Sequence, residues 1–225
     1  MLNTIVAESL SLIADQLDKL KSNDFAGLTK ILSEVIKENK KVLFAGSNYA
    51  EEWHAEAAKR GLPNNKSTVD ALPALQTEEA KRIFAQFGVL SERELESRLD
   101  IAWERYVKVQ NIEANATIEI ARTMLVPAAV AYLGQLGAAA KSKGANKLAD
   151  RIAGLVDSLM EKIDALEKAQ HAAHAAGSVH AEAKAFKERV IPAQDLVRDA
   201  ADELETLVSD ELWPLPKYRE LLFQF

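Results

Sequence analysis

Apolar residues recur three and four positions apart along most of this chain, and that spacing is typical of amphipathic helices. Only residues 41–45, KVLFA, have the composition of an extended strand, and one short strand cannot form a sheet. The pattern therefore predicts an all-α fold, organised as a helical bundle.

The N-terminal part of the chain predicts two helices. The first spans residues 2–20, and the second begins after Asp24, whose carboxylate is a suitable N-cap. Because both have an apolar side, we expect them to pack against each other as a helical hairpin. The apolar positions are Ile5, Leu12, Ile13, Leu17 and Leu20 in the first helix, and Leu28, Ile31, Leu32, Val35 and Ile36 in the second.

Residues typical of helix ends divide the next part. Ser47 or Asn48 can cap a helix that reaches Arg60, where Gly61 supplies a left-handed C-terminal residue and Pro63 prevents continuation. We expect the following residues to form a loop with at most one short helical turn.

A long helix is predicted after this loop. Ser91 and Glu94 form the capping box S-x-x-E at its start. We expect the helix to continue to Val126 and to bend or break at Pro127, which lacks a backbone donor.

The most regular pattern lies in residues 145–209 and predicts a long antiparallel, coiled-coil-like hairpin. Its alanine-rich turn offers little apolar area to bury, so we expect the tip to project from the body. Pro192 is expected to kink the returning helix. The two stripes are Leu148, Ile152, Leu155, Leu159, Leu166, Ala169 and Ala173, then Val179, Ala183, Phe186, Val190, Ala193, Val197, Ala200, Leu204 and Leu207.

Composition narrows the class of protein. The net charge is -6, with basic residues interspersed among acidic ones, so there is no basic stripe to neutralise phosphates and nucleic acid is not an expected partner. The chain has no cysteine, which fits a reducing compartment. The apolar run 124–134 is too short to span a bilayer and contains a proline, and no signal peptide is recognisable. We expect a soluble, cytoplasmic protein without a membrane partner.

Three histidines near the predicted hairpin tip are candidates for a metal site. Spacings of three and four residues share a helix face, and imidazole is a common ligand for zinc or nickel. The alternative is that they are surface histidines on a solvated tip. The group comprises His171, His174 and His180, with Glu167 and Glu182 nearby.

Two further acidic positions invite a chemical interpretation. Glu51 and His54 have the E-x-x-H spacing of di-iron helical bundles, but the sequence contains no second pair of this kind. Glu113 continues an apolar stripe of the long helix, so we expect it to be partly buried. A buried carboxylate needs a cation, so a structural ion pair with Arg98, with Arg122 or with a neighbouring chain is preferred to a catalytic role.

The aromatic residues and the C-terminal segment are interpreted as packing features. Trp53, Trp103 and Trp213 are expected to be core or interface anchors rather than ligand stackers. Pro214 and Pro216 prevent helix in the LWPLP segment, and the apolar tail after it should dock on the body or on another subunit. That tail contains Tyr218, Leu221, Leu222, Phe223 and Phe225.

No assembled active site can be recognised. The serines Ser91, Ser178 and Ser209 are all placed as helix-end residues, and no glycine-rich nucleotide loop is present. We therefore assign no catalytic, cofactor-binding or metal residue to this chain.

Several segments together resemble the C-terminal region of type III glutamine synthetases. They cover nearly the whole chain, although residues 138–185 contribute little. The segments are LNTIVAESL (2–10), EEWH (51–54), KRGLPN (59–64), STVDALPAL (67–75), FGVLSERELESR (87–98), NIEA (111–114), VPA (126–128) and LWPLPKYRELLF (212–223).

The resemblance implies a helical accessory or oligomerisation domain of a larger ligase that makes glutamine from glutamate, ammonia and ATP. Enzymes of this family use magnesium or manganese and assemble as dodecamers of two hexameric rings. The family's metal ligands, ATP-binding segment and substrate arginines would precede Leu2, because the chain opens inside a helix that resembles the end of the catalytic domain.

The resemblance also implies a division of the chain. Residues 1–45 would form the hairpin that resembles the tail of the catalytic domain, and residues 46–225 the helical C-terminal domain. The expected partners are the catalytic domain of the parent synthetase and further copies of the chain. Two alternatives remain open from the sequence: a free-standing helical scaffold or adaptor, and an autonomous helical-bundle metalloenzyme.

Overall fold

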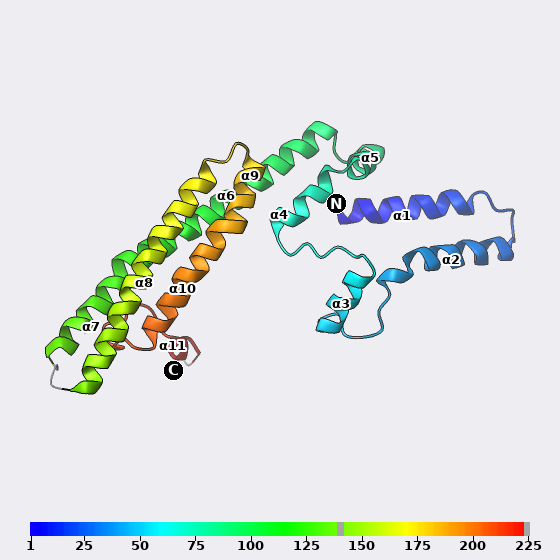
Figure 1. Cartoon of the computed structure of the whole chain (residues 1–225). Coiled ribbons are helices and arrows are strands. Elements are labelled where there is room, and N and C mark those ends of the chain that lie inside the picture. The colour runs from blue at the N-terminus through cyan, green and yellow to red at the C-terminus, as the bar shows by residue number, and fades with distance from the viewer. Residues whose placement is uncertain (139–141, 223–225) are drawn as a thin grey trace. The chain divides into compact units, whose positions relative to one another are not determined.

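The computed structural model describes residues 1–138 and 142–222, and these residues form helices, turns and loops without a strand (Figure 1). The expected all-α class is therefore confirmed. The chain divides into two compact units, Met1–Leu99 and Asp100–Phe225. The boundary expected between residues 45 and 46 stays a prediction.

The first unit contains short helices, and three of its five described α-helices begin with a side-chain cap. Asp24 accepts a hydrogen bond from the Gly27 amide, as expected, and Ser67 and Thr77 cap two later helices. In order, the elements are α1 (Leu2–Leu17), α2 (Phe25–Asn39), the 3-10 helix η1 (Lys40–Val42), α3 (Glu51–Lys59), α4 (Thr68–Ala71), η2 (Leu72–Gln76) and α5 (Glu78–Gln86).

Two expectations for this unit are wrong. Residues 40–42 form a 3-10 turn that continues α2, and the extended backbone begins only at Leu43. The next helix begins at Glu51, and Ala50 at its N-cap position has no side chain that can cap it. The Ser47 hydroxyl accepts a hydrogen bond from the Tyr49 amide, 3.4 Å away, and does not cap the helix. Gly61 has φ of 70° and ends α3 as expected.

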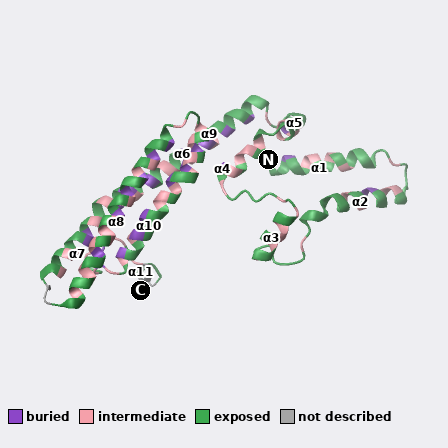
Figure 2. Ribbon diagram, in the orientation of Figure 1, coloured by how far each residue is buried: buried purple, intermediate pink, exposed green. Residues whose placement is uncertain are grey.

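Helix α1 turns its apolar side outward. It contacts α2 and α5, but the residue that it buries is Thr4, and Glu8 pairs with Arg82 of α5 at 2.8 Å. Ile5 and Leu12 remain 51% and 53% exposed. The two N-terminal helices therefore touch, and Leu20 of the predicted stripe lies against Gly27 of α2, whereas Ile5 and Leu12 of that stripe face outward. Figure 2 shows how little of α1 and α2 is buried.

The core of the first unit lies where α5 meets the start of α6. Phe84, Leu95 and Leu99 are buried there, and partly buried leucines from η2 and the α5–α6 turn pack around them. The capping box is confirmed: the Glu94 carboxylate accepts from the Ser91 amide (2.8 Å) and hydroxyl (2.7 Å), and the Ser91 hydroxyl accepts from the Glu94 amide (3.3 Å).

Helix α6 (Glu92–Ile120) does not end at Pro127. It continues through a π-helical turn, η3 (Ala121–Leu125), into α7 (Val126–Ala138), and the Val126 amide donates to the carbonyl of Ala121. A wider turn directly before a proline relieves the clash between its ring and the preceding turn. The expected break is therefore absent.

The second unit is built around α8 (Lys143–His174), which begins at the Ser142 cap and contacts α7, η3, α9, η4 and α10. Helix α9 (Val179–Ala185) continues through a second π turn, η4 (Phe186–Val190), into α10 (Ile191–Glu205), whose second residue is Pro192. Figure 1 shows α8 and α10 side by side, and α11 (Tyr218–Leu222) ends the described part. The buried apolar residues of these elements are Ile152, Leu159, Ile163, Leu166, Ala173, Ala183, Phe186, Val190, Val197, Ala200 and Leu204.

Within residues 1–138 and 142–222, one helical stretch is apolar enough to cross a membrane by length and composition. It spans Glu92–Ala138 and contains an 18-residue window with a mean hydropathy of 1.3, of which 28% is buried. Ile118, Leu125 and Ala129 in this stretch are buried, and η3 and α7 contact α8. Part of the apolar character therefore belongs to the protein core, and the expected lack of a membrane partner stays a prediction.

Candidate functional site

A polar network joins α6, α8 and α9 near the end of α8. The two ring nitrogens of His174 lie 2.7 Å from Glu182 Oε1 and 2.9 Å from Asn111 Oδ1. Gln170 is only 9% exposed and donates through Nε2 to Asn111 Oδ1 (2.6 Å) and to Asn115 Oδ1 (2.7 Å). Buried amides of this kind are stable only when paired, so the network fixes how the three helices meet.

The histidine group considered as a candidate metal site does not assemble around these residues. His171 is exposed, the ring of His180 packs on Trp103 with centroids 4.7 Å apart, and Glu167 pairs with Arg122. Among residues 1–138 and 142–222, no three metal-ligating side chains gather. Within this group, His174 and Glu182 share a hydrogen bond, and His171 has a weaker charge interaction with Glu167.

The expectation for Glu113 is wrong. Its side chain is exposed and accepts a hydrogen bond from Gln110 at 3.1 Å. The buried side of α6 contains Trp103 and Val107 and then Ala114, which places position 113 beside the stripe rather than in it.

Arg122 instead forms an ion pair between helices. Its guanidinium donates to both carboxylate oxygens of Glu167, at 2.6 and 2.9 Å, and lies 3.6 Å from Asp164. These hydrogen bonds hold the pKa of Glu167 below its ordinary value and raise the pKa of Arg122. Because both side chains remain more than a third exposed, the pair contributes modestly to stability.

The other candidate pair is Glu51 and His54, which could have belonged to a di-iron site. Glu51 and His54 are both exposed on α3. Near them, the half-buried Trp53 contacts Phe44 (centroids 4.7 Å apart) and the Arg60 guanidinium, 5.8 Å from its ring centroid. This group ties the extended residues after η1 to α3 and is structural.

The tryptophans of the second unit are core anchors, as predicted. Trp103 is 1% exposed and Trp213 is 8% exposed. Both indole Nε1 atoms are buried without a hydrogen-bond partner among the described residues. The segment after Trp213 is held by Lys217, whose Nζ donates to the Glu205 carbonyl at 2.8 Å and pairs with Asp210. Phe223 and Phe225, which we expected to dock, lie outside the described residues.

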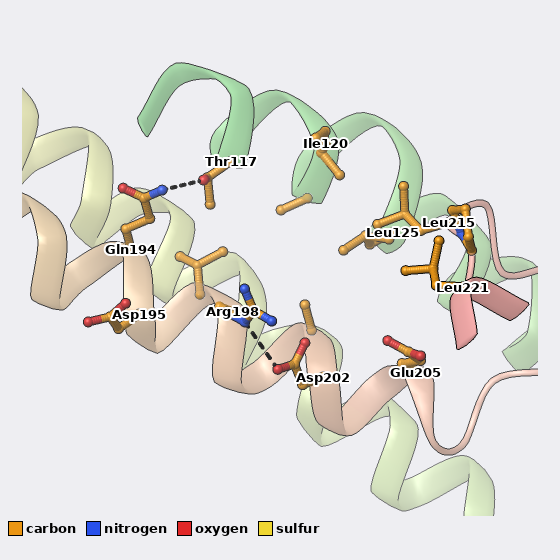
Figure 3. Close-up of a pocket in the computed structure, with 14 residues that line it drawn as sticks. Thr117, Ile120, Leu125, Gln194, Asp195, Arg198, Asp202, Glu205, Leu215 and Leu221 are labelled. Atoms are coloured by element: carbon orange, nitrogen blue, oxygen red, sulfur yellow. Dashed lines mark hydrogen bonds and ion pairs between the residues drawn. The ribbon is translucent and has the colours of Figure 1, made fainter. Parts of the chain in front are cut away.

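A cavity of about 430 Å³ lies in the second unit between α6–η3, α10 and the segment that precedes α11 (Figure 3). Ile120 and Leu125 form an apolar wall, and α10 places charged groups on the opposite wall, where Arg198 donates to Asp202 at 3.4 Å. Gln194 donates to the Thr117 hydroxyl at 2.9 Å on one side of the cavity. The cavity therefore combines an apolar wall with a charged one.

Sequence reasoning missed the amides of the polar network. Asn111, Asn115 and Gln170 give no motif, since Gln170 is 59 and 55 positions from its two partners. The available signal was an Asn pair one helical turn apart, close to the buried side of an amphipathic helix.

Comparisons with known proteins give a consistent result. Residues 27–144 match the family described as the glutamine synthetase C-terminal domain. The type-3 glutamine synthetase of Dictyostelium discoideum is 33% identical over 99% of this chain and 32% of its own length. The glutamine synthetase of Bacteroides fragilis is 29% identical over 99% of this chain and 33% of its own length. The glutamine synthetase of Butyrivibrio fibrisolvens is 32% identical over 92% of this chain and 30% of its own length. The chain thus spans about a third of the length of these relatives. It belongs to the glutamine synthetase C-terminal domain family.

Proposed function

We propose that this chain is the helical accessory domain of a type III glutamine synthetase and helps to hold its oligomer together. The observation that carries the proposal is the match: nearly all of this chain corresponds to about a third of each full-length relative. The parent enzyme would make glutamine from glutamate, ammonia and ATP with magnesium or manganese. The catalytic residues would belong to the other two thirds.

The outward face of α1 and α2 is the proposed contact with the rest of the enzyme. This apolar face comprises side chains that are half exposed or more, and it lies opposite the side that carries Thr4 and Glu8. Burying one aliphatic side chain fully is worth about 1.5–3 kcal/mol, so leaving a whole face in water is costly. The face consists of Leu2, Ile5, Val6, Leu10, Leu12, Phe25, Leu32 and Ile36.

The proposed scaffold of the accessory domain is an antiparallel, coiled-coil-like hairpin over residues 145–209. Contacts of α8 with α9, η4 and α10 support it, as do apolar residues buried at spacings of three and four on both sides. The proposed location is the cytoplasm, and the partners are the catalytic domain and other copies of the enzyme rather than nucleic acid or a membrane.

The first test reads the gene upstream of the Leu2 codon in the same frame. We expect an open frame that encodes the remaining two thirds of a glutamine synthetase. A stop codon followed by a ribosome-binding site would contradict the proposal and favour a free-standing helical protein.

The second test changes the apolar face in the full-length enzyme. Val6→Lys places a charge in the proposed contact, and Asp15→Lys introduces the same side chain at an exposed position of α1 on the side that carries Thr4 and Glu8. We expect Val6→Lys to lower the assembled mass in light scattering and the rate of glutamine formation, and Asp15→Lys to leave both near the unaltered values. Equal behaviour of the two variants would refute the proposed contact.

A further inference from the structure

The two nitrogens of His174 both face hydrogen-bond acceptors. A carboxylate such as that of Glu182 only accepts, so the proton on Nδ1 is directed to it. Asn111 Oδ1 also accepts, since it already receives a hydrogen from Gln170 Nε2. The network as it stands is complete only when both ring nitrogens carry a hydrogen, which is the imidazolium form of His174.

When the His174 ring loses one proton, one rearrangement preserves every contact of the network. The charge-assisted bond to Glu182 is the stronger one, so the proton leaves from Nε2 to solvent, which reaches the ring because 42% of the side chain is exposed. Nε2 then needs a donor, and Asn111 provides one by turning its NH2 group toward it. That turn presents a second N–H of the same group to Gln170.

The reversal continues along the chain of amides. Gln170 must turn so that Oε1 replaces Nε2, and the two lone pairs of this oxygen accept from Asn111 and Asn115. Asn115 must therefore also turn its NH2 group inward. Donors and acceptors balance among these contacts in both arrangements, and within each amide only the oxygen and the nitrogen exchange positions.

We propose that His174, Asn111, Gln170 and Asn115 form a proton-operated relay across α8, in which the charge state of His174 sets the direction of all three amides. The output is at Asn115, which is exposed on α6. With His174 protonated, Asn115 presents its NH2 group to solvent, and with His174 neutral it presents its oxygen. The α6 surface changes from donor to acceptor without a movement of the helices, and a partner docked there would sense the difference.

The ring of His174 contacts groups from three neighbouring elements. Among the described residues, Glu182 is the charged group recorded against the ring, α6 contributes the neutral Asn111, and η4 contributes the Phe186 ring, with centroids 5.2 Å apart. On α8 itself, the exposed His171 is the nearest titratable residue in the sequence. We therefore assign the turning of the amides to the gain or loss of the proton on His174.

The test follows the side-chain NH2 signals of the full chain labelled with nitrogen-15 by NMR between about pH 5 and 8, where imidazoles ordinarily titrate. We expect the signals of Asn111, Gln170 and Asn115 to shift together, with the same midpoint as the His174 ring. The matched variants are His174→Gln, which retains a donor toward Asn111 but carries no titrating proton, and His171→Gln. The amide shifts should vanish in the first and persist in the second.

Three results would overturn the relay: amide signals that stay constant while His174 titrates, amide shifts that survive in His174→Gln, or a His174 ring whose charge does not change in this range. If His174→Gln fails to give a helical circular dichroism spectrum, the pH series of the unaltered chain decides alone, because it compares midpoints within one molecule.

Discussion

Arg122 in η3 binds Glu167 on α8 through two parallel hydrogen bonds of 2.6 and 2.9 Å. The pair fastens the π turn before Pro127 to the central helix of the second unit. The pair also explains how the apolar stretch Glu92–Ala138 accommodates the charged residue Arg122, because its guanidinium binds a carboxylate at the edge of the core.

Glu167→Gln should lower the free energy of unfolding by about 0.5–1 kcal/mol at neutral pH, a small value because solvent screens the half-exposed pair. The pKa of Glu167 is lowered in the folded state, chiefly by the hydrogen bonds from Arg122. Its stabilisation is therefore present above the ordinary carboxyl pKa and is lost as the pH falls through the lowered value. Urea unfolding at several pH values measures this. Glu161→Gln changes an exposed position on the same helix and is the control. It should alter neither the free energy of unfolding nor the way that this energy falls at acid pH.

Ser91→Ala should shorten the start of α6 and lower the free energy of unfolding by about 1 kcal/mol, the usual contribution of an N-cap. The amide and hydroxyl of Ser91 lower the pKa of Glu94, and the hydroxyl is lost in this variant. The Glu94 pKa should therefore rise toward its ordinary value, which NMR titration would show. An unchanged Glu94 titration would mean that the backbone amide alone holds the carboxylate.

Gly134→Ala should stabilise the protein by about 0.5–1 kcal/mol, because a methyl group there meets nothing within 4 Å and alanine favours helix. Gly61→Ala is the contrasting change. Its added methyl also has space, but φ at this position is +70°, so we expect destabilisation. Thermal unfolding of both variants measures the difference, and a loss of stability in Gly134→Ala would indicate that α7 needs close approach by another surface.

Trp103→Phe should cost much less than Trp103→Ala, for which about 3–5 kcal/mol is expected at a fully buried aromatic position. Phenylalanine retains most of the packing, and the indole Nε1 has no hydrogen-bond partner among the described residues to lose. Guanidinium unfolding compares the two variants. Equal costs would show that the indole nitrogen makes a stabilising contact, for example with a buried water.

Features that depend on a few neighbouring residues could be predicted from the sequence. The Asp24 cap, the Ser91–Glu94 box and the Gly61 helix end each depend on suitable residues at one or two positions, and each is present. The family likewise follows from short segments that recur in order.

Features that depend on the phase of a long helix or on distant partners could not be predicted. The stripe of α6 can be read through Ala102 or through Trp103, and only packing decides that Trp103 is buried, which moves Glu113 to the surface. The outward side of α1 is a similar case, since an apolar stripe does not reveal which partner covers it. The Gln170 network joins residues that only the tertiary fold brings together.

Each of the two π turns adds one residue to its helix shortly before a proline, so the proline and the extra residue depend on each other. A π turn contains one residue more than the α-helical turn that it replaces. Deleting one residue from 121–125 would return Pro127 to an ordinary α-helical turn, where its ring clashes, and would rotate every later side chain of α7 relative to α8. Replacing Pro127 alone would leave an extra residue with no proline to accommodate. Loss of the proline and loss of the extra residue are thus tolerated together better than singly, and the same holds for Pro192 and residues 186–190. In a lineage of such domains, insertions, deletions and proline changes at these two places should therefore occur as linked events.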